Sequence, residues 1–99
     1  MQPEERIRHL LEKGGVLGDR YRLAIMLYLS LKGRARFKEI AEGLGISAGN
    51  LAHHLKVLEE KGYIKVDKTW EDMRARIISL TSEGVVSLAD FLTALKELS

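Results

Sequence analysis

Residues 37–66 read FKEIAEGLGISAGNLAHHLKVLEEKGYIKV and contain two short amphipathic segments separated by a tight glycine turn. Apolar residues of the first segment recur at the spacing of one helix face: Phe37, Ile40, Ala41 and Leu44. Gly45 then ends the first helix, and Ser47 is a good N-cap for a second helix, which Gly62 ends. Two short helices joined in this way predict a helix-turn-helix over about residues 37–61.

The second helix of this motif, over about residues 47–61, carries the features of a DNA recognition helix. Its inner face is fixed by three leucines: Leu51, Leu55 and Leu58. A step of about 100° per residue places Gly49, His53 and Lys56 on the opposite face. Asn50 lies beside them. Small residues allow close approach to the major groove, asparagine reads adenine edges, and lysine or histidine reaches bases or phosphates. Asn50 serves equally well in the helix cap, and Lys56 as a solvated lysine.

After the second helix the periodicity changes to two residues, which predicts a β-hairpin wing over about residues 63–80. Basic side chains on such a ribbon suit the DNA backbone or the minor groove, where arginine is favoured. Glu71 and Asp72 at the loop tip oppose contacts with phosphates. Arg74 and Arg76 are therefore preferred over the loop as a whole.

Further basic residues flank the motif. Arg34, Arg36 and Lys38 flank the start of its first helix, where a phosphate contact and a plain surface role are equally consistent with the sequence. At the start of the second helix, Ser47 can share its hydroxyl between the cap and a phosphate, which the helix N-terminus favours. The predicted DNA-binding residues are Arg36, Lys38, Ser47, Gly49, Asn50, His53, Lys56, Lys68, Arg74 and Arg76.

Three further helices are expected outside the motif and the wing. Pro3, followed by two glutamates, begins a helix over about residues 3–13. Asp19 caps a helix that runs to about Lys32, and a last helix covers about residues 82–98. The apolar faces of the first and last helices are wide enough to pack against a second chain, or to complete the core of one chain. The residues expected at a dimer interface are Ile7, Leu10, Leu11, Leu88, Phe91, Leu92, Leu95 and Leu98.

The composition of the 99 residues fits one domain, residues 1–99, mainly α-helical with a small β-hairpin. The absence of cysteine excludes disulfides, thiolate metal sites and cysteine nucleophiles. His53 and His54 point about 100° apart on a helix and cannot easily hold one metal ion, so no metal or cofactor is predicted. His54 lies about 60° from the leucine stripe and is expected at the boundary of the helix, with a local hydrogen bond. No apolar run approaches the roughly 18 residues of a membrane span, and the charged first residues do not resemble a signal peptide. A cytoplasmic protein is therefore expected. The net charge of +2 permits nucleic-acid binding without establishing it.

The motif and its flanks resemble winged helix-turn-helix transcriptional regulators of the ArsR and MarR type. The resemblance is carried by IAEGLGIS at residues 40–47, NLAHHLKVLEEKGYI at residues 50–64, ISLT at residues 78–81 and DRYRLAIM at residues 19–26. It implies a three-helix core with a wing, dimerised through N- and C-terminal helices. By matching position, the recognition helix would include Ser47, Asn50, His53 and Lys56. Metal-sensing ArsR relatives usually carry cysteines near that helix, and this chain has none.

Together, these patterns predict a homodimeric transcriptional regulator that binds specific sites on double-stranded DNA. The recognition helix would enter the major groove, and residues 65–76 of the wing would lie on the backbone or in the minor groove. The alternative is a winged helix used for protein–protein association, because acidic and basic residues nearly balance. No enzymatic role is expected, since the sequence has no phosphate-cradling glycine loop, no His-Glu-x-x-His and no nucleophile paired with a base. The sequence leaves room for an unidentified small-molecule effector but does not indicate one.

Overall fold

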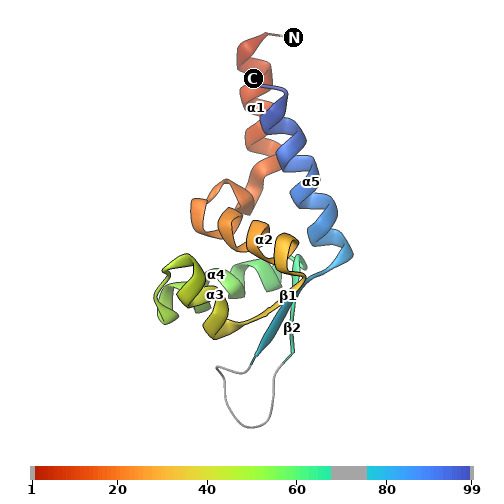
Figure 1. The fold of residues 1–99 in the computed structure, drawn as a ribbon. Helices are drawn as coiled ribbons and strands as arrows, with labels where there is room; N and C mark the ends of the chain where they lie inside the picture. The colour runs from red at the N-terminus through yellow and green to blue at the C-terminus, as the bar shows by residue number, and fades with distance from the viewer. Residues whose placement is uncertain (1, 68–75, 99) are drawn as a thin grey trace.

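The computed structural model describes residues 2–67 and 76–98 and shows a winged helix-turn-helix fold (Figure 1). The elements follow in the order α1 (Pro3–Gly14), a 3-10 turn η1 (Gly15–Gly18), α2 (Arg20–Lys32), β1 (Arg34–Arg36), α3 (Phe37–Leu44), α4 (Ala48–Glu60), β2 (Ile64–Asp67), β3 (Ile77–Leu80) and α5 (Ser82–Lys96). The expected fold class, mainly α with a small antiparallel sheet, is confirmed. The sequence did not predict η1 or β1.

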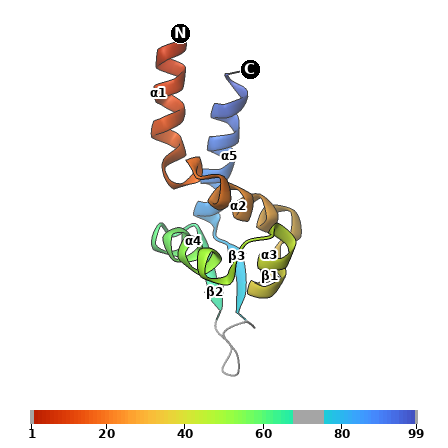
Figure 2. The same cartoon turned by 90° about the vertical axis from the view of Figure 1, so that its left-hand side faces the viewer.

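The first and last helices form a separate limb of the molecule. In Figures 1 and 2, α1 and α5 lie side by side and extend away from α2, α3, α4 and the sheet, with both chain ends toward the far tip. The molecule is accordingly elongated, with extents of 53 × 25 × 22 Å. None of the helices among the described residues has both the length and the apolar character to cross a membrane.

Side-chain caps set the start of the core helices. The Asp19 carboxylate accepts hydrogen bonds from the backbone N–H groups of Tyr21 (2.8 Å) and Arg22 (3.1 Å), and so begins α2. The Ser47 hydroxyl accepts a hydrogen bond from the backbone N–H of Asn50 (3.3 Å) at the start of α4. Each cap satisfies backbone donors that a helix N-terminus otherwise leaves free. Both caps were predicted from the sequence.

The start of α5 is joined closely to the end of α4 and the start of β2. The Thr81 hydroxyl accepts from the backbone N–H of Gly84 (3.0 Å) and donates to the carbonyl oxygen of Gly62 (2.6 Å). Gly84 lies so close to the backbone of Tyr63 that a Cβ atom would overlap the Tyr63 carbonyl oxygen. Thr81 is therefore the N-cap of α5, and a glycine is required inside the first turn of this helix.

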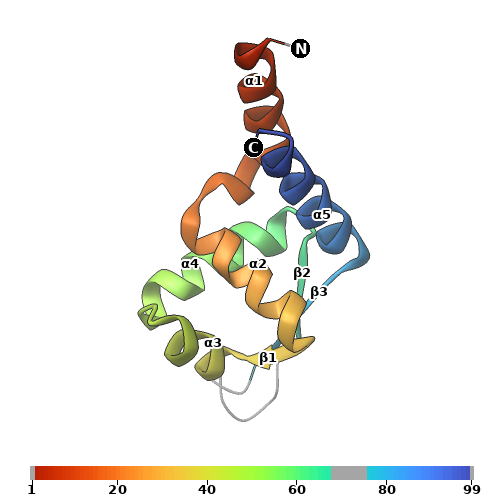
Figure 3. The same ribbon diagram turned by 45° about the horizontal axis from the view of Figure 1, so that its top comes forward.

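The sheet has three antiparallel strands in the order β1-β3-β2. Ile78 of β3 pairs with both Ala35 and Val66, and these side chains face the helices. Helix α2 packs against α3, α4, α5 and β3 and fills the centre of the molecule (Figure 3). Eight side chains are almost completely buried there: Leu17, Ile25, Met26, Leu29, Ile40, Leu51, Leu58 and Ile78.

The structure corrects the predicted dimer interface at two positions. Leu88 and Phe91 of α5 are only 4% and 5% exposed, because that face of α5 packs into the core of its own chain. Leu10 is half-buried and packs against the same core. The other predicted interface residues are 38–70% exposed: Ile7, Leu11, Leu92, Leu95 and Leu98.

Candidate nucleic-acid interface

The turn between α3 and α4 fixes how α4 is presented. Gly45 has φ +65° and ψ 36°, a left-handed conformation that suits glycine, and it ends α3. Ile46 follows at 6% exposure and anchors the turn in the core. Leu51 and Leu58, each fully buried, then hold the inner face of α4 against the rest of the domain.

The outer face of α4 is free of packing. Gly49, His53 and Lys56 are exposed, and Asn50 is half-buried at their side. A Cβ added to Gly49 would meet no atom within 4 Å, so the space in front of the first turn of α4 is open. The structure thus presents these four residues as the sequence predicted, and their contact with DNA stays a prediction.

A hollow of about 280 Å³ lies between α4 and the wing strands and brings together two of the predicted cations. Lys56 lines it from α4, and Arg76, the residue before β3, lines it from 20 residues later in the chain. Glu59 adds one acidic group. The residues that line the hollow are Phe37, Ala52, Leu55, Lys56, Glu59, Val66 and Arg76. The hollow beside α4 is therefore lined by apolar residues together with two basic side chains and one acidic side chain.

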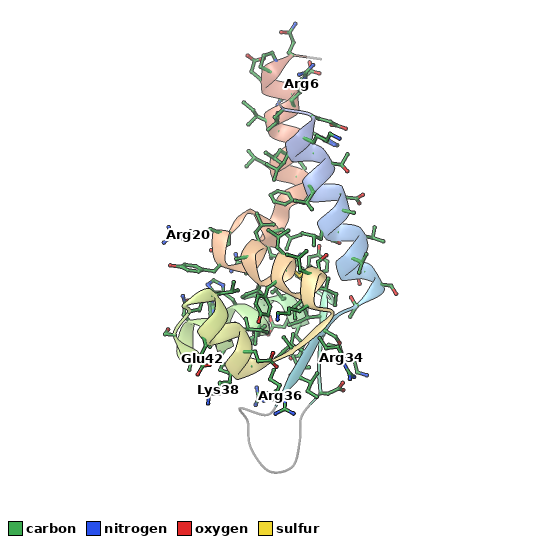
Figure 4. The ribbon with its side chains drawn as sticks, in the orientation of Figure 1. Arg6, Arg20, Arg34, Arg36, Lys38 and Glu42 are labelled. Carbon is green, nitrogen blue, oxygen red and sulfur yellow. The ribbon has the colours of Figure 1, made fainter. Side chains whose placement is uncertain are left out.

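The basic residues of β1 and of the first turn of α3 lie at the wing end of the molecule (Figure 4). Figure 4 shows Arg34, Arg36 and Lys38 pointing away from the helical core. Lys38 lies 3.9 Å from Glu42, but both side chains are at least 66% exposed. Such exposed pairs contribute little and do not hold the lysine away from other partners.

Arg34 is a basic surface residue that the predicted set omitted. It pairs with Ser79 across β1 and β3, so its side chain lies on the face of the sheet opposite to buried Ala35. The sequence had placed it beside Arg36 and Lys38 as a possible phosphate contact, and the exposed, buried, exposed pattern of Arg34–Arg36 leaves its side chain accessible. Two members of the predicted set, Lys68 and Arg74, lie outside the described residues.

His54 differs from its sequence interpretation. A local hydrogen bond at the boundary of the helix was expected, but the side chain is 5% exposed and turned toward α2. Burial is the main cause that lowers the pKa of His54 below its ordinary value. Within the described part of the chain, no cluster of three or more histidine and carboxylate side chains is arranged to hold a metal ion.

Comparisons with known proteins agree with this geometry. Residues 21–99 match the family model described as a winged helix DNA-binding domain. A transcriptional regulator homologue from Pyrococcus horikoshii OT3 is 32% identical, with a TM-score of 0.86 over 95% of this chain and 93% of that one. NMB1585, a MarR family regulator from Neisseria meningitidis, shares the fold at 24% identity, with a TM-score of 0.68 over 80% of this chain and 56% of its own.

A third similar structure was solved with nucleic acid. The transcriptional repressor CouR, bound to a 23-mer DNA duplex, is 25% identical to this chain, with a TM-score of 0.75. The match covers 93% of this chain and 66% of CouR. The chain described here belongs to the winged helix DNA-binding domain family of transcriptional regulators, and its fold is that of the MarR-type members.

Proposed function

We propose that this protein is a homodimeric regulator that binds specific sites on double-stranded DNA, with α4 in the major groove. One observation carries the proposal: the outer face of α4 is exposed, and Lys56 and Arg76 both line the hollow beside it. The similarity to CouR, which was solved on a DNA duplex, supports the same reading.

The chemistry of α4 suits the major groove. A groove about 12 Å wide admits one helix, and the small side chain of Gly49 lets the first turn approach the base edges. Asn50 and His53 offer hydrogen-bonding groups for those edges. The N-terminus of α4, with its cap at Ser47, favours a phosphate. Lys56 and Arg76 would contact the backbone that borders the groove.

The dimer is supported by the limb formed by α1 and α5. Ile7 and Leu11 on α1 are 51% and 70% exposed, and Leu92, Leu95 and Leu98 on α5 remain about 40% exposed. Large apolar side chains grouped on paired helices mark an association surface. A second copy packed there would place two recognition helices about 34 Å apart on a near-palindromic site.

The base of the same limb offers room for a small-molecule effector, which we include in the proposal. A largely apolar hollow of about 400 Å³ lies where α1, η1, α2 and α5 meet. Its lining includes Leu10, Leu23, Phe91 and Leu95, with Arg20 also present. A compound that binds there should raise the melting temperature of the parent chain but not that of Leu23→Trp, which fills the hollow.

DNA binding is tested by fluorescence anisotropy with labelled random-sequence duplex at 50 and 200 mM salt. We expect binding that weakens steeply with salt, because phosphate contacts release counterions. Lys56→Ala combined with Arg76→Ala should weaken binding and lower the salt slope by about 2, roughly 1 per lost phosphate contact. Selection from a random pool should then enrich one near-palindromic sequence.

The matched control removes two positive charges far from the candidate interface. Arg6 and Arg8 lie on α1, at the opposite end of the molecule from the wing strands (Figure 4). Arg6→Ala with Arg8→Ala should bind DNA nearly as the parent does. Equal loss in both double variants would indicate nonspecific attraction by net charge, and no binding at low salt would favour the protein-association alternative.

A further inference from the structure

The inner side of the recognition helix contains one polar contact that the proposed DNA binding does not use. His54 is the buried polar side chain among the described residues, at 5% exposure, and it lies on α4 one residue after exposed His53. Its Nδ1 atom is 3.1 Å from Nη1 of Arg22 on α2. A guanidinium only donates hydrogen bonds, so Nδ1 must accept and the ring proton must reside on Nε2.

Arg22 connects this histidine to a third element. Its Nε donates to the carbonyl oxygen of Val16 in η1 at 2.7 Å. The guanidinium of Arg22 therefore bridges η1 and α4 from its position on α2. Because η1 follows α1 directly, Arg22 lies between the limb formed by α1 and α5 and the recognition helix α4.

Aromatic contacts hold the histidine ring in place. The ring of Tyr21 stacks on His54, with centroids 5.5 Å apart and planes inclined by 29°. Arg20 in turn covers Tyr21, with its guanidinium carbon 4.8 Å from the ring centroid (Figure 4). The ring thus has a fixed orientation, with Nδ1 directed at Arg22.

The surroundings favour a neutral His54. Burial lowers its pKa most, the charges of Arg22 and His53 lower it further, and Asp19 acts in the opposite direction. The titratable and charged groups around the ring are Asp19, Tyr21 and Arg22 at the start of α2, and His53 on α4. Residues 15–18 of η1 contain none.

We propose that Arg22 and His54 are a positioning pair that sets the orientation of recognition helix α4 against α2 and η1. The proposal rests on the proposed DNA binding. Removing the acceptor leaves the guanidinium without its partner on α4. Protonating the ring has the same effect, because two donors then face one another. Either change frees α4 to tilt, while the apolar core that holds the fold is untouched.

The test uses the full chain in a His53→Gln background, so that His54 is the one imidazole on α4. His54→Asn keeps an acceptor near the position of Nδ1 but does not titrate, and His54→Leu removes the acceptor. The binding of one selected duplex is measured by anisotropy at pH 7.5 and pH 5.5, with circular dichroism to verify folding at each pH. We expect the parent background to bind several-fold more weakly at pH 5.5, and less than tenfold, because the lowered pKa of His54 limits protonation of the ring at this pH.

The two variants separate positioning from general stability. His54→Asn should bind within about threefold of the parent background at pH 7.5 and should lose the pH dependence. His54→Leu should bind about tenfold more weakly at both pH values while still folded. Equal affinity of the leucine and asparagine variants, or a pH dependence that persists in His54→Asn, overturns the proposal.

A measurement without DNA tests the contact between Arg22 and His54 independently of the proposed function. Long-range ¹H–¹⁵N correlation spectra of the histidine rings report which nitrogen carries the proton. We expect the Nε2–H form for His54, with a pKa below the ordinary value because the ring is buried. An Nδ1–H form refutes the pair even if the protein binds DNA. If no variant binds any duplex, the proposed function fails, and the spectra still decide whether the pair exists.

Discussion

The close approach between α5 and the start of the wing makes a quantitative prediction about Gly84. An alanine Cβ at this position would lie 2.9 Å from the carbonyl carbon of Tyr63 and 3.1 Å from its Cα, besides overlapping the carbonyl oxygen. Carbon atoms prefer separations of about 3.5–4.0 Å. The obstructing atoms are backbone, so Gly84→Ala can be accommodated only if the helix start moves away from the strand.

The expected loss in the free energy of unfolding follows from the contacts that this movement disturbs. Overpacking of this kind costs about 1–3 kcal/mol. The shift also strains two hydrogen bonds, from the backbone N–H of Thr81 to the Tyr63 carbonyl (3.0 Å) and from the Thr81 hydroxyl to the Gly62 carbonyl (2.6 Å). Each contributes about 1 kcal/mol. The higher helix propensity of alanine returns about 1 kcal/mol. Gly84→Ala should therefore lower the free energy of unfolding by about 2–4 kcal/mol.

Urea denaturation followed by circular dichroism measures this change. All samples are compared at one protein concentration, because a dimer's stability depends on it. The matched control is Gly49→Ala, also a glycine in the first turn of a helix, where a Cβ meets no atom within 4 Å. It should be neutral or gain up to about 1 kcal/mol. Equal stability of the two variants would refute the claim that the Tyr63 backbone excludes a side chain here.

Three further predictions concern the cap of α2, the apolar limb and the sheet. Asp19→Ala should cost about 1 kcal/mol at pH 7. Partial burial raises the pKa of Asp19, but hydrogen bonds from the backbone N–H groups of Arg22 and Tyr21, with the Arg22 charge, bring it below its ordinary value. The stability that ionised Asp19 contributes is thus complete above its unfolded-state pKa and is lost as pH falls through the lower folded-state pKa. The urea midpoints of the parent and Asp19→Ala should therefore converge toward pH 3. A gap that stays constant with pH argues against the cap. Leu11→Glu should convert the proposed dimer to a monomer in sedimentation velocity. Leu31→Glu is the control, because Leu31 near the end of α2 is 88% exposed, and it should leave the dimer intact. Identical sedimentation of both variants would count against the proposed interface. Ile78→Val removes one methylene from the fully buried centre of the sheet and should cost about 1 kcal/mol in the same urea assay, and a neutral result would mean that the site collapses around the smaller side chain.

Helices were the part of the fold that could be predicted, because their signals are local. Asp19 and Ser47 stand immediately before apolar residues with helical spacing, and both act as caps in the structure. Strand β1 was not predicted, because its three residues are too few to carry a clear periodic signal. It forms because β3, some 40 residues later, offers a free edge.

The candidate site was predictable where one helix defines it, and less so where several elements meet. A helical wheel places Gly49 and Lys56 opposite the leucines, but it cannot show that Arg76 shares the same hollow. For α5, a helical wheel shows which residues share a face but not which neighbour covers that face. Phe91 was therefore assigned to the dimer interface, although its own chain buries it. His54 was misread for the same reason, since its partner Arg22 lies 32 residues earlier.

The short connection from wing to limb has a mechanical consequence. Strand β3 passes into α5 with only Thr81 between them, and the hydroxyl of that residue holds the junction to the Gly62 carbonyl. The 15 residues of α5 are then a lever about 22 Å long, at 1.5 Å per residue, with the wing strand fixed to its base. In the proposed dimer, a 10° change in how two copies of α5 cross would displace the wing end by about 4 Å relative to the partner, roughly the rise of one base pair. Substitutions at the far tip of α5 could thus change the preferred half-site spacing without touching DNA.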